Sequence, residues 1–222
     1  MLETFKKKML FNIKRSLAVI IDVTAIALIS GSLSVSPLNP HYEKTYELQT
    51  EFEELTNQYL EEVEGIDEED EDKLVDLFEE YKENTINYTY EASRKSIYSQ
   101  MISIACTFLY FALFAYYFDG QTVGKRLMKL KIVTVEEDKP SLKRMTLRTT
   151  ITYGIPFSVL ASIFAFTIPK ESFYIANVLL YYLTVVFTLI LIFSSFTNED
   201  RRGLHDFLTK TKVVEDNKKE KE

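Results

Sequence analysis

Residues 15–31 read RSLAVIIDVTAIALISG, an apolar run that begins with a basic residue and contains one carboxylate. About 20 apolar residues cross the hydrocarbon core of a bilayer, which is roughly 30 Å thick. Because the apolar character continues to residue 35, the run predicts a membrane-spanning helix over residues 17–35. Asp22 lies inside this helix, where a carboxylate is costly unless it is paired, protonated or facing water.

Three further segments are long and apolar enough to span a membrane, namely residues 97–118, 149–168 and 173–196. The first and the last of these contain no charged residue. Helices of soluble proteins are rarely apolar all round, so a soluble bundle of buried helices is the weaker interpretation. Gly154 and Pro156 stand near the start of the 149–168 segment and predict an early kink in that helix.

The overall charge conceals two opposite regions. The 222-residue chain has a net charge of −7 and a mean hydropathy near zero, as a soluble acidic protein would have. Residues 41–95 hold 19 of the 33 acidic residues and only five basic ones, a net charge of −14, so the rest of the chain carries +7. The sequence therefore joins an acidic soluble segment to a cationic, apolar part. Cys106 is the single cysteine of the sequence, which excludes an intrachain disulfide.

The placement of lysine and arginine predicts the orientation in the membrane. Residues 1–16 carry five basic side chains against one acidic, and residues 119–148 carry eight against four. The tail from residue 197 carries seven of each, whereas the loop 36–96 is acidic. We therefore expect both termini and the 119–148 connection in the cytoplasm and the acidic loop outside. Because no small-residue cleavage site follows the basic N-terminus convincingly, we expect an uncleaved first span.

The acidic loop has helical periodicity. Apolar and aromatic residues recur at spacings of three, four and seven, as in the seam between two paired helices: Leu48, Phe52, Leu55, Tyr59, Leu74, Leu77, Tyr81 and Tyr88. Between the two halves lies GIDEEDEDK at residues 65–73, which predicts a solvated turn. The acid block is also a candidate for a divalent cation, although it lacks the glycine spacing of a calcium loop. The pattern predicts a helical hairpin over residues 36–96.

The expected fold class is an all-α membrane protein with four transmembrane helices, an extracytoplasmic helical hairpin and a small cytoplasmic β element. The segments LMKLKIVTVEEDKPSLKR (127–144) and TKTKVVED (209–216) are β-prone and predict that β element. The expected organisation is a cytoplasmic N-terminus with the first span, the acidic hairpin, three further spans with their connection, and a cytoplasmic tail. These parts cover residues 1–35, 36–96, 97–196 (connection 119–148) and 197–222.

Three stretches together resemble the RDD family of bacterial multi-pass membrane proteins: RSLAVIID (15–22), FDGQTVGKRLMKLKIV (118–133) and RRGLHDFLTKTKVV (201–214). The resemblance covers roughly residues 12–35 and 97–214, and the acidic hairpin looks like an insertion between them. Members of the family are connected with ion exchange and with the regulation of membrane proteases, so the resemblance implies a location in the cell membrane more than one reaction. The positions that it carries over are Arg15, Asp22, Gly120, Gly124, Lys125, Arg148, His205 and Asp206.

These polar residues predict two charge pairs. Side chains on a helix lean toward its N-terminus, so Asp22 needs a donor from the cytoplasmic side, and Arg15 leans away from it. We expect Arg148 to be the partner of Asp22, with Lys125 as the second choice, and Asp206 to be the partner of Arg15. Asp22 is then either a structural latch or an ion- or proton-binding carboxylate, because intramembrane acids often mark permeation routes.

The segment GQTVGKR allows two interpretations. Its glycines and basic residues suggest a phosphate loop, but the Walker pattern is absent. We favour a membrane-surface motif, in which Gly120 and Gly124 bend the chain and Lys125 and Arg126 contact anionic headgroups.

The sequence predicts neither a metal site nor a catalytic one. His205 has one companion histidine, His41, and the expected topology puts the two on opposite sides of the membrane, so we expect no metal site. We also expect no cofactor and no enzyme, because no Ser-His-Asp, Cys-His or zinc-protease pattern appears.

Two functions remain open at this stage. The leading one is a membrane protein that transports a small ion or solute, or assists that transport, with Asp22 at the polar site. The alternative is a regulatory or scaffold protein whose acidic hairpin binds a basic partner protein or gathers cations outside the membrane. The expected surroundings are the lipid bilayer and further copies of the chain, without nucleic acid.

Overall fold

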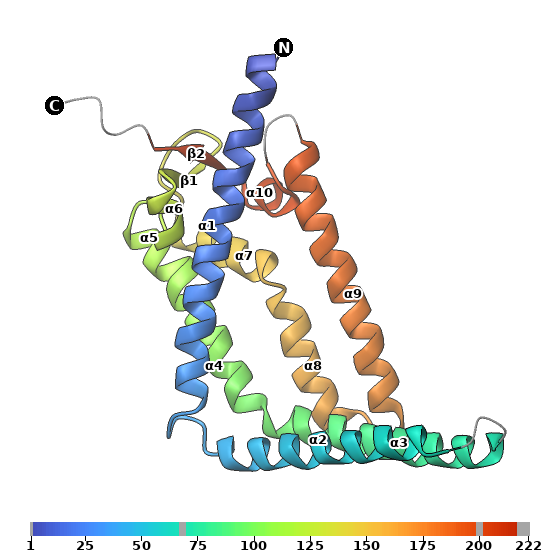
Figure 1. Cartoon of the computed structure of the whole chain (residues 1–222). Helices are drawn as coiled ribbons and strands as arrows, with labels where there is room; N and C mark the ends of the chain where they lie inside the picture. Colours follow the sequence, from blue (N-terminus) through green and yellow to red (C-terminus); the bar gives the residue numbers. More distant parts are fainter. Residues whose placement is uncertain (1, 67–69, 199–201, 217–222) are drawn as a thin grey trace. The chain divides into compact units, whose positions relative to one another are not determined.

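Helices make up most of the protein in the computed structural model, which describes residues 2–66, 70–198 and 202–216 (Figure 1). Three helical stretches of the described chain, Met9–Ser34, Ile97–Tyr117 and Lys170–Phe196, are long and apolar enough to cross a membrane. They lie in helix α1 (Leu2–Ser34), in the run α4 (Ile97–Phe108), η1 (Leu109–Phe114) and α5 (Ala115–Tyr117), and in helix α9 (Lys170–Thr197). Large apolar side chains on them are exposed, for example Leu28 and Phe193, as suits contact with lipid.

The predicted third span is a bent pair of helices. Helix α7 (Leu142–Thr152) and helix α8 (Ile155–Thr167) pass the length and composition test together, but they meet at an angle of 62°. Gly154 has a φ of 59°, a conformation that glycine adopts without strain, and Pro156 lacks the N–H that would continue the helix. The predicted kink is therefore present, and α7 begins seven residues before the predicted start of the span.

Two short strands form the expected β element. Strand β1 (Leu130–Thr134) pairs antiparallel with β2 (Thr211–Glu215), with Ile132 opposite Val213. The small helices α6 (Val123–Leu127) and α10 (Leu204–Thr209) directly precede the two strands in the chain. The two strands therefore confirm the predicted pairing of the 127–144 and 209–216 segments.

The chain divides into two units, and the first contains the strands. It is built from Met1–Ser32, Met101–Pro156 and Leu183–Glu222. Its core joins α1, the π-helical turn η1, α5, α7 and the sheet through eight buried side chains: Phe11, Ala18, Ala112, Ala115, Leu130, Ile132, Met145 and Val213. Helix α7 packs against η1, and α10 packs against α7. This unit contains all residues of the expected charge pairs and of the GQTVGKR segment.

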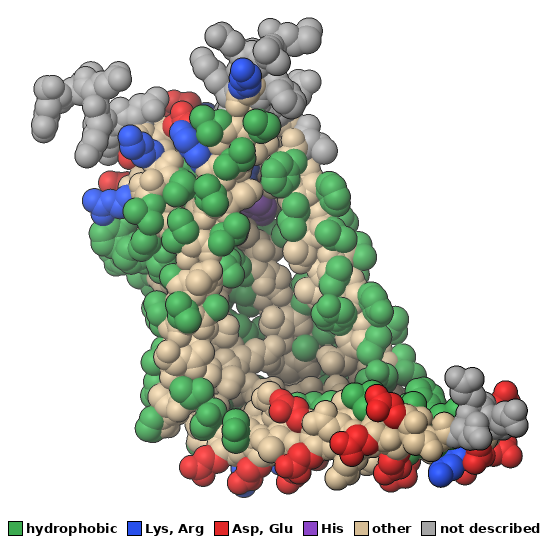
Figure 2. Space-filling model, in the orientation of Figure 1, with side chains coloured by type: hydrophobic (Ala, Val, Ile, Leu, Met, Phe, Trp, Pro, Cys, Tyr) green, Lys and Arg blue, Asp and Glu red, His purple; other side chains and the backbone are tan. Residues whose placement is uncertain are grey.

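The second unit comprises Leu33–Gln100 and Phe157–Tyr182. Its helices α2 (Tyr42–Glu64) and α3 (Glu71–Lys95) pack against each other through stacked rings. The Phe52 and Tyr88 ring centroids are 4.0 Å apart, and those of Tyr59 and Tyr81 are 4.2 Å apart. Acidic side chains follow this helix pair in Figure 2. Half of the acid block proposed as a turn or a cation site falls on residues 67–69, which lie outside the described part of the chain.

Candidate functional site

Asp22 of α1 is completely buried and is surrounded by donors, an arrangement that we call the Asp22 site. Its Oδ1 accepts hydrogen bonds from the Tyr110 hydroxyl at 2.6 Å and from the Gly124 backbone N–H at 2.7 Å. Its Oδ2 accepts one from the Thr122 hydroxyl at 2.5 Å and lies 3.6 Å from the Lys125 ammonium nitrogen. Three hydrogen bonds and an ion pair therefore replace the water that this carboxylate loses on burial.

Local backbone features bring these donors to Asp22. Tyr110 lies in η1, and a π-helical turn inside an α-helix changes which residues face a neighbour. Thr122 caps the N-terminus of α6 and accepts a hydrogen bond from the Lys125 N–H at 3.4 Å. At Gly124, a Cβ atom would lie 2.9 Å from the carboxyl carbon of Asp22, and it would also press on the carbonyl oxygen of Ala18. Only glycine lets α6 approach α1 this closely.

Lys125 has an unusual environment for a lysine. Its side chain is buried, and its Nζ lies 3.2 Å from the Thr122 hydroxyl oxygen and 5.9 Å from the centre of the Phe111 ring. Burial and the nearby charge of Arg148 lower the pKa of Lys125 to about 8, against the opposing effect of Asp22. Lys125 is therefore a cation that is held in place at an energetic cost.

Asp206 of α10 forms the second centre, which we call the Asp206 site. This carboxylate is completely buried. Its Oδ1 accepts hydrogen bonds from Arg148 Nε and Nη2, at 3.1 and 2.8 Å, and one from the Thr211 hydroxyl at 3.3 Å. Its Oδ2 accepts from Arg15 Nη2 at 2.8 Å and from the Gly203 N–H at 3.1 Å. Asp206 thus joins α1, α7 and β2 to α10 through one carboxylate.

Charge keeps Asp206 ionised. Burial by itself raises the pKa of this carboxyl, but the charge of Arg148, the charge of Arg15 and the hydrogen bond from Arg148 outweigh it and hold the pKa below its usual range. A buried carboxylate depends on such partners, because its charge is costly once it is left without any of them.

His205 lies beside this pair. Its Nε2 is 3.4 Å from Arg15 Nη2 and 3.4 Å from Asp206 Oδ2. Burial, followed by the charge of Arg148, lowers the pKa of His205 to about 3, and Asp206 opposes this shift. The imidazole is therefore neutral at pH 7. Its buried Nδ1 has no hydrogen-bond partner among the described residues.

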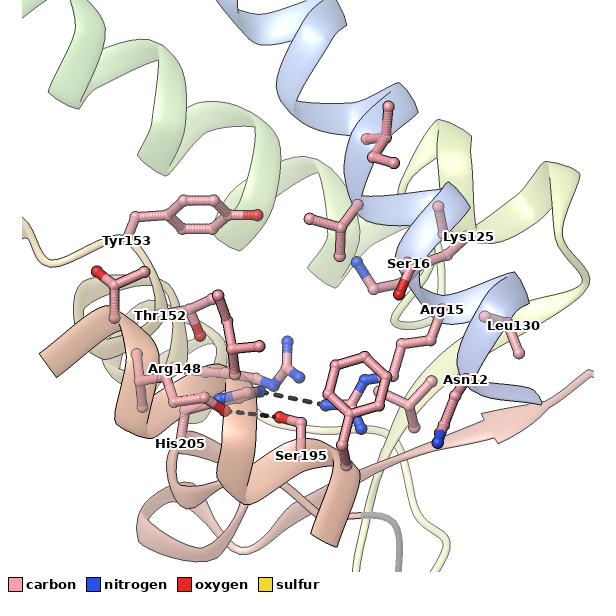
Figure 3. A pocket seen from close by; sticks show the side chains of 18 residues that line it. Asn12, Arg15, Ser16, Lys125, Leu130, Arg148, Thr152, Tyr153, Ser195 and His205 are labelled. Atoms are coloured by element: carbon pink, nitrogen blue, oxygen red, sulfur yellow. Dashed lines mark hydrogen bonds between the residues drawn. The ribbon is translucent and has the colours of Figure 1, made fainter. Parts of the chain in front are cut away.

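A cavity of about 540 Å³ adjoins both sites (Figure 3). Arg15, Lys125 and Arg148 line it, together with His205, and Lys125 and Arg148 extend toward the same part of the cavity from opposite sides. The other lining residues are apolar or carry a small polar group: Asn12, Ser16, Ala18, Val19, Ile20, Leu130, Thr152, Tyr153, Thr188, Leu191, Ile192, Ser195, Phe196 and Val213.

The structure corrects one of the predicted pairs. The expected pairing of Asp22 with Arg148 is wrong, because Arg148 donates to Asp206. Lys125, the second choice, is the basic side chain that lies against Asp22. The expected pair of Arg15 with Asp206 is present at 2.8 Å. The tilt of helix side chains toward the N-terminus correctly indicated the side from which a donor reaches Asp22. It could not select the donor, because three helices place basic residues on that side.

The membrane-surface interpretation of GQTVGKR also needs correction. Lys125 is buried instead of facing headgroups, and Gly124 donates to Asp22 instead of bending the chain at a surface. Gly120 lies against β1, where its carbonyl accepts the Ile132 N–H at 2.9 Å. Arg126 is exposed, so its contact with headgroups stays a prediction.

Sequence reasoning missed two donors of the Asp22 site. Thr122 lies inside the quoted GQTVGKR segment, and its position three residues before Lys125 in an N-cap pattern was an available signal. Tyr110 had no such signal, because it is one of 14 tyrosines and stands in an otherwise apolar span. Within the described ranges, no three histidine, cysteine or carboxylate side chains come together as metal ligands would.

The apolar helices and the buried ionic network define a helical membrane-type protein with a charged centre beside a cavity. The sequence pattern of the RDD family matches residues 12–210, which is most of the chain, so the protein belongs to the RDD family. A comparison with curated proteins and one with solved structures each gave no match.

Proposed function

We propose that this RDD-family protein is a non-catalytic, multi-pass protein of the bacterial cell membrane that moves a small ion or solute, or assists that movement. The observation that supports this best is the cavity of about 540 Å³, which lies among helices apolar enough to span a bilayer and is lined by Arg15, Lys125 and Arg148. Ionisable residues at membrane depth are expensive and typically mark solute or ion pathways.

The proposed orientation has both termini and the 119–148 connection in the cytoplasm. It is supported by the excess of lysine and arginine over acidic residues in residues 1–16 and 119–148. In this orientation the Asp206 site and the sheet lie toward the cytoplasm. The chain offers few spans, so we further propose that a pathway forms in a homo-oligomer.

Asp22 then acts as a positioning residue. Its oxygens are occupied by Tyr110, Thr122 and Gly124, so a solute meets Lys125 before it meets the carboxylate. Because Asp22 and the hydroxyl of Thr122 hold the ammonium group, loss of the negative charge should release Lys125 or favour its neutral form.

The decisive experiment is ion and proton flux in proteoliposomes, comparing the native protein with Asp22→Asn. A matched control is Asp119→Asn, which removes an exposed carboxylate that lies 3.2 Å from Lys139 in the same cytoplasmic connection. We expect flux above empty liposomes, a strong loss with Asp22→Asn, and no loss with Asp119→Asn. Absent flux, or flux that Asp22→Asn leaves unchanged in a folded protein, would remove this function.

A second function is supported by the acidic hairpin. Neither α2 nor α3 has a buried residue, and residues 41–95 carry a net charge of −14. Such a field attracts a basic partner protein or gathers cations. We propose this as a regulatory or scaffold role on the extracytoplasmic side.

Deletion of residues 41–95 separates the two functions. Transport should largely survive the deletion, whereas co-purification of a partner in mild detergent should vanish. A charge-reversal variant tests the electrostatic part of the second function while it keeps the hairpin. It replaces three exposed glutamates of α2 by lysine, namely Glu47, Glu51 and Glu54. Partner binding that is unchanged in this variant would exclude a role for the acidic field.

A further inference from the structure

The described lining of the cavity carries an unbalanced charge. Arg15, Lys125 and Arg148 line it, and no carboxylate is among the lining residues. Asp22 and Asp206 are completely buried behind these cations. Three basic side chains therefore face two carboxylates, and His205 is neutral at pH 7. The charged side chains of the described lining are therefore all basic.

A cavity whose charged lining is basic attracts an anion. Donors remain for such an anion. Arg148 uses Nε and Nη2 for Asp206, so its Nη1 is left to face the cavity. The Lys125 ammonium group is 3.6 Å from its carboxylate, longer than a direct hydrogen bond. Figure 3 shows these two side chains reaching toward each other across the cavity.

The rest of the lining is suited to an apolar body. Val19 and Ile20 of α1 and Ile192 and Phe196 of α9 line the cavity and are each between 44 and 60% exposed. Apolar side chains on helices that are long enough to span a bilayer face acyl chains when they are exposed. The cavity therefore offers both cations and apolar side chains from two helices that are apolar enough to meet lipid. A fully hydrated inorganic ion would gain nothing from these walls.

We propose that this cavity binds a phosphate-type monoanion that carries an apolar chain, as an anionic membrane phospholipid does. The phosphate contacts Lys125 and Arg148, and the chain lies along α1 and α9. A free phosphate ion has the same charged chemistry without the apolar part, so the experiment must separate the two sources. The inference goes beyond the proposed function by naming a class of ligand, and the two can fail separately because binding is measured without flux.

The test is native mass spectrometry of the full chain in detergent, titrated with phosphatidylglycerol, phosphatidylcholine or inorganic phosphate. We expect one phosphatidylglycerol to be retained at least about tenfold more tightly than phosphatidylcholine, a difference of about 1.4 kcal/mol. Millimolar inorganic phosphate should not displace it. Equal retention of the two lipids, or displacement by inorganic phosphate, would overturn the proposal.

Variants locate the site. Lys125→Gln should weaken phosphatidylglycerol retention about tenfold. Its matched control is Lys143→Gln, which removes an exposed lysine of α7 that is not part of the lining. Retention that Lys125→Gln leaves unchanged would place the lipid elsewhere and overturn the proposal.

A second pair of variants does not touch the ionic network. Thr188→Trp fills the cavity from α9, and Ile190→Trp places the same side chain at an exposed position outside the lining. We expect Thr188→Trp to abolish the retention of phosphatidylglycerol and Ile190→Trp to leave it unchanged. Circular dichroism should show that both variants are folded. Ion flux without retention of phosphatidylglycerol would overturn this inference and leave the proposed function standing. Retention of phosphatidylglycerol without ion flux would overturn the proposed function and leave this inference standing.

Discussion

Arg148 donates two hydrogen bonds to a single oxygen of Asp206, from Nε at 3.1 Å and from Nη2 at 2.8 Å. This contact joins α7 to α10, two elements that are 58 positions apart in sequence at these residues. Both side chains are buried, so neither can replace its partner with bulk water. The pair therefore acts as a clamp between the helix bundle and the C-terminal segment.

The clamp predicts a strong coupling between its members. Asp206→Asn should lower the free energy of unfolding in detergent by about 3 kcal/mol, because it removes the carboxylate that both Arg15 and Arg148 contact. Arg148→Gln should lower it by less, because Asp206 keeps its ion pair with Arg15. The double variant should lose about 1–3 kcal/mol less than the sum of the single losses. Thermal or denaturant unfolding followed by circular dichroism gives the three values.

The matched cycle uses Asp22→Asn with Arg148→Gln. Because the partners of Asp22 are Tyr110, Thr122, Gly124 and Lys125, the two losses should add to within about 0.5 kcal/mol. A coupling between Asp22 and Arg148 as large as that between Arg148 and Asp206 would contradict the described pairing.

Gly124→Ala should destabilise the protein. The new methyl group would lie 2.9 Å from the Asp22 carboxyl carbon, and backbone atoms of Ala18 block its retreat, so we expect a loss of about 1–3 kcal/mol from overpacking. Gly31→Ala is the control on α1, because nothing lies within 4 Å of its added Cβ. That change should be neutral or stabilising by up to about 1 kcal/mol. Equal unfolding midpoints for the two variants would show that α6 does not approach α1 closely.

Tyr110→Phe removes a donor to Asp22 and the acceptor of the Val123 N–H. Hydrogen bonds to charged groups contribute about 1.5–3 kcal/mol, and the 2.6 Å bond should lie in that range. Tyr117→Phe removes a hydroxyl from a side chain that is 69% exposed, so its effect should stay within about 0.5 kcal/mol. The measurement is the unfolding free energy in detergent. A Tyr110→Phe variant as stable as Tyr117→Phe would mean that the hydroxyl does not serve Asp22.

Acidification should weaken the folded state through His205. Its pKa falls from 6.5 to about 3 on folding, chiefly because of burial and the charge of Arg148. Below pH 6.5 the unfolded chain therefore takes up a proton that the folded chain does not. The contribution of neutral His205 to the free energy of unfolding is complete above pH 6.5 and is lost progressively as the pH falls toward 3.

The readout is the melting temperature in detergent between pH 7 and pH 5. It should fall in the native protein and fall less in His205→Gln. Asp206, whose pKa is below its usual range, begins to matter only under pH 3.8 and so lies outside this window. Parallel curves for the two proteins would indicate that His205 is already protonated, or is exposed, in the folded state.

Structural features that depend on residues close together in the sequence could be predicted well. The apolar runs specified the long helices of the described chain, because apolar length is a property of one contiguous segment. Gly154 and Pro156 specified the bend of 62° between α7 and α8 for the same local reason. The β-prone segments that contain Ile132 and Val213 were also correctly paired. Even the pair of Arg15 with Asp206 followed from the side of the membrane on which each residue was expected.

The sequence by itself determined the membrane character, the spans, the sheet and the set of polar residues that meet in the first unit. Only the tertiary structure decided which cation lies against Asp22. Asp22 and Gly124 are 102 positions apart, and their contact depends on how closely two backbones approach, which no periodicity records. Lys125 and Arg148 carry the same charge, so charge alone could not assign them. The choice depends on the missing Cβ of Gly124, which brings α6 rather than α7 against Asp22.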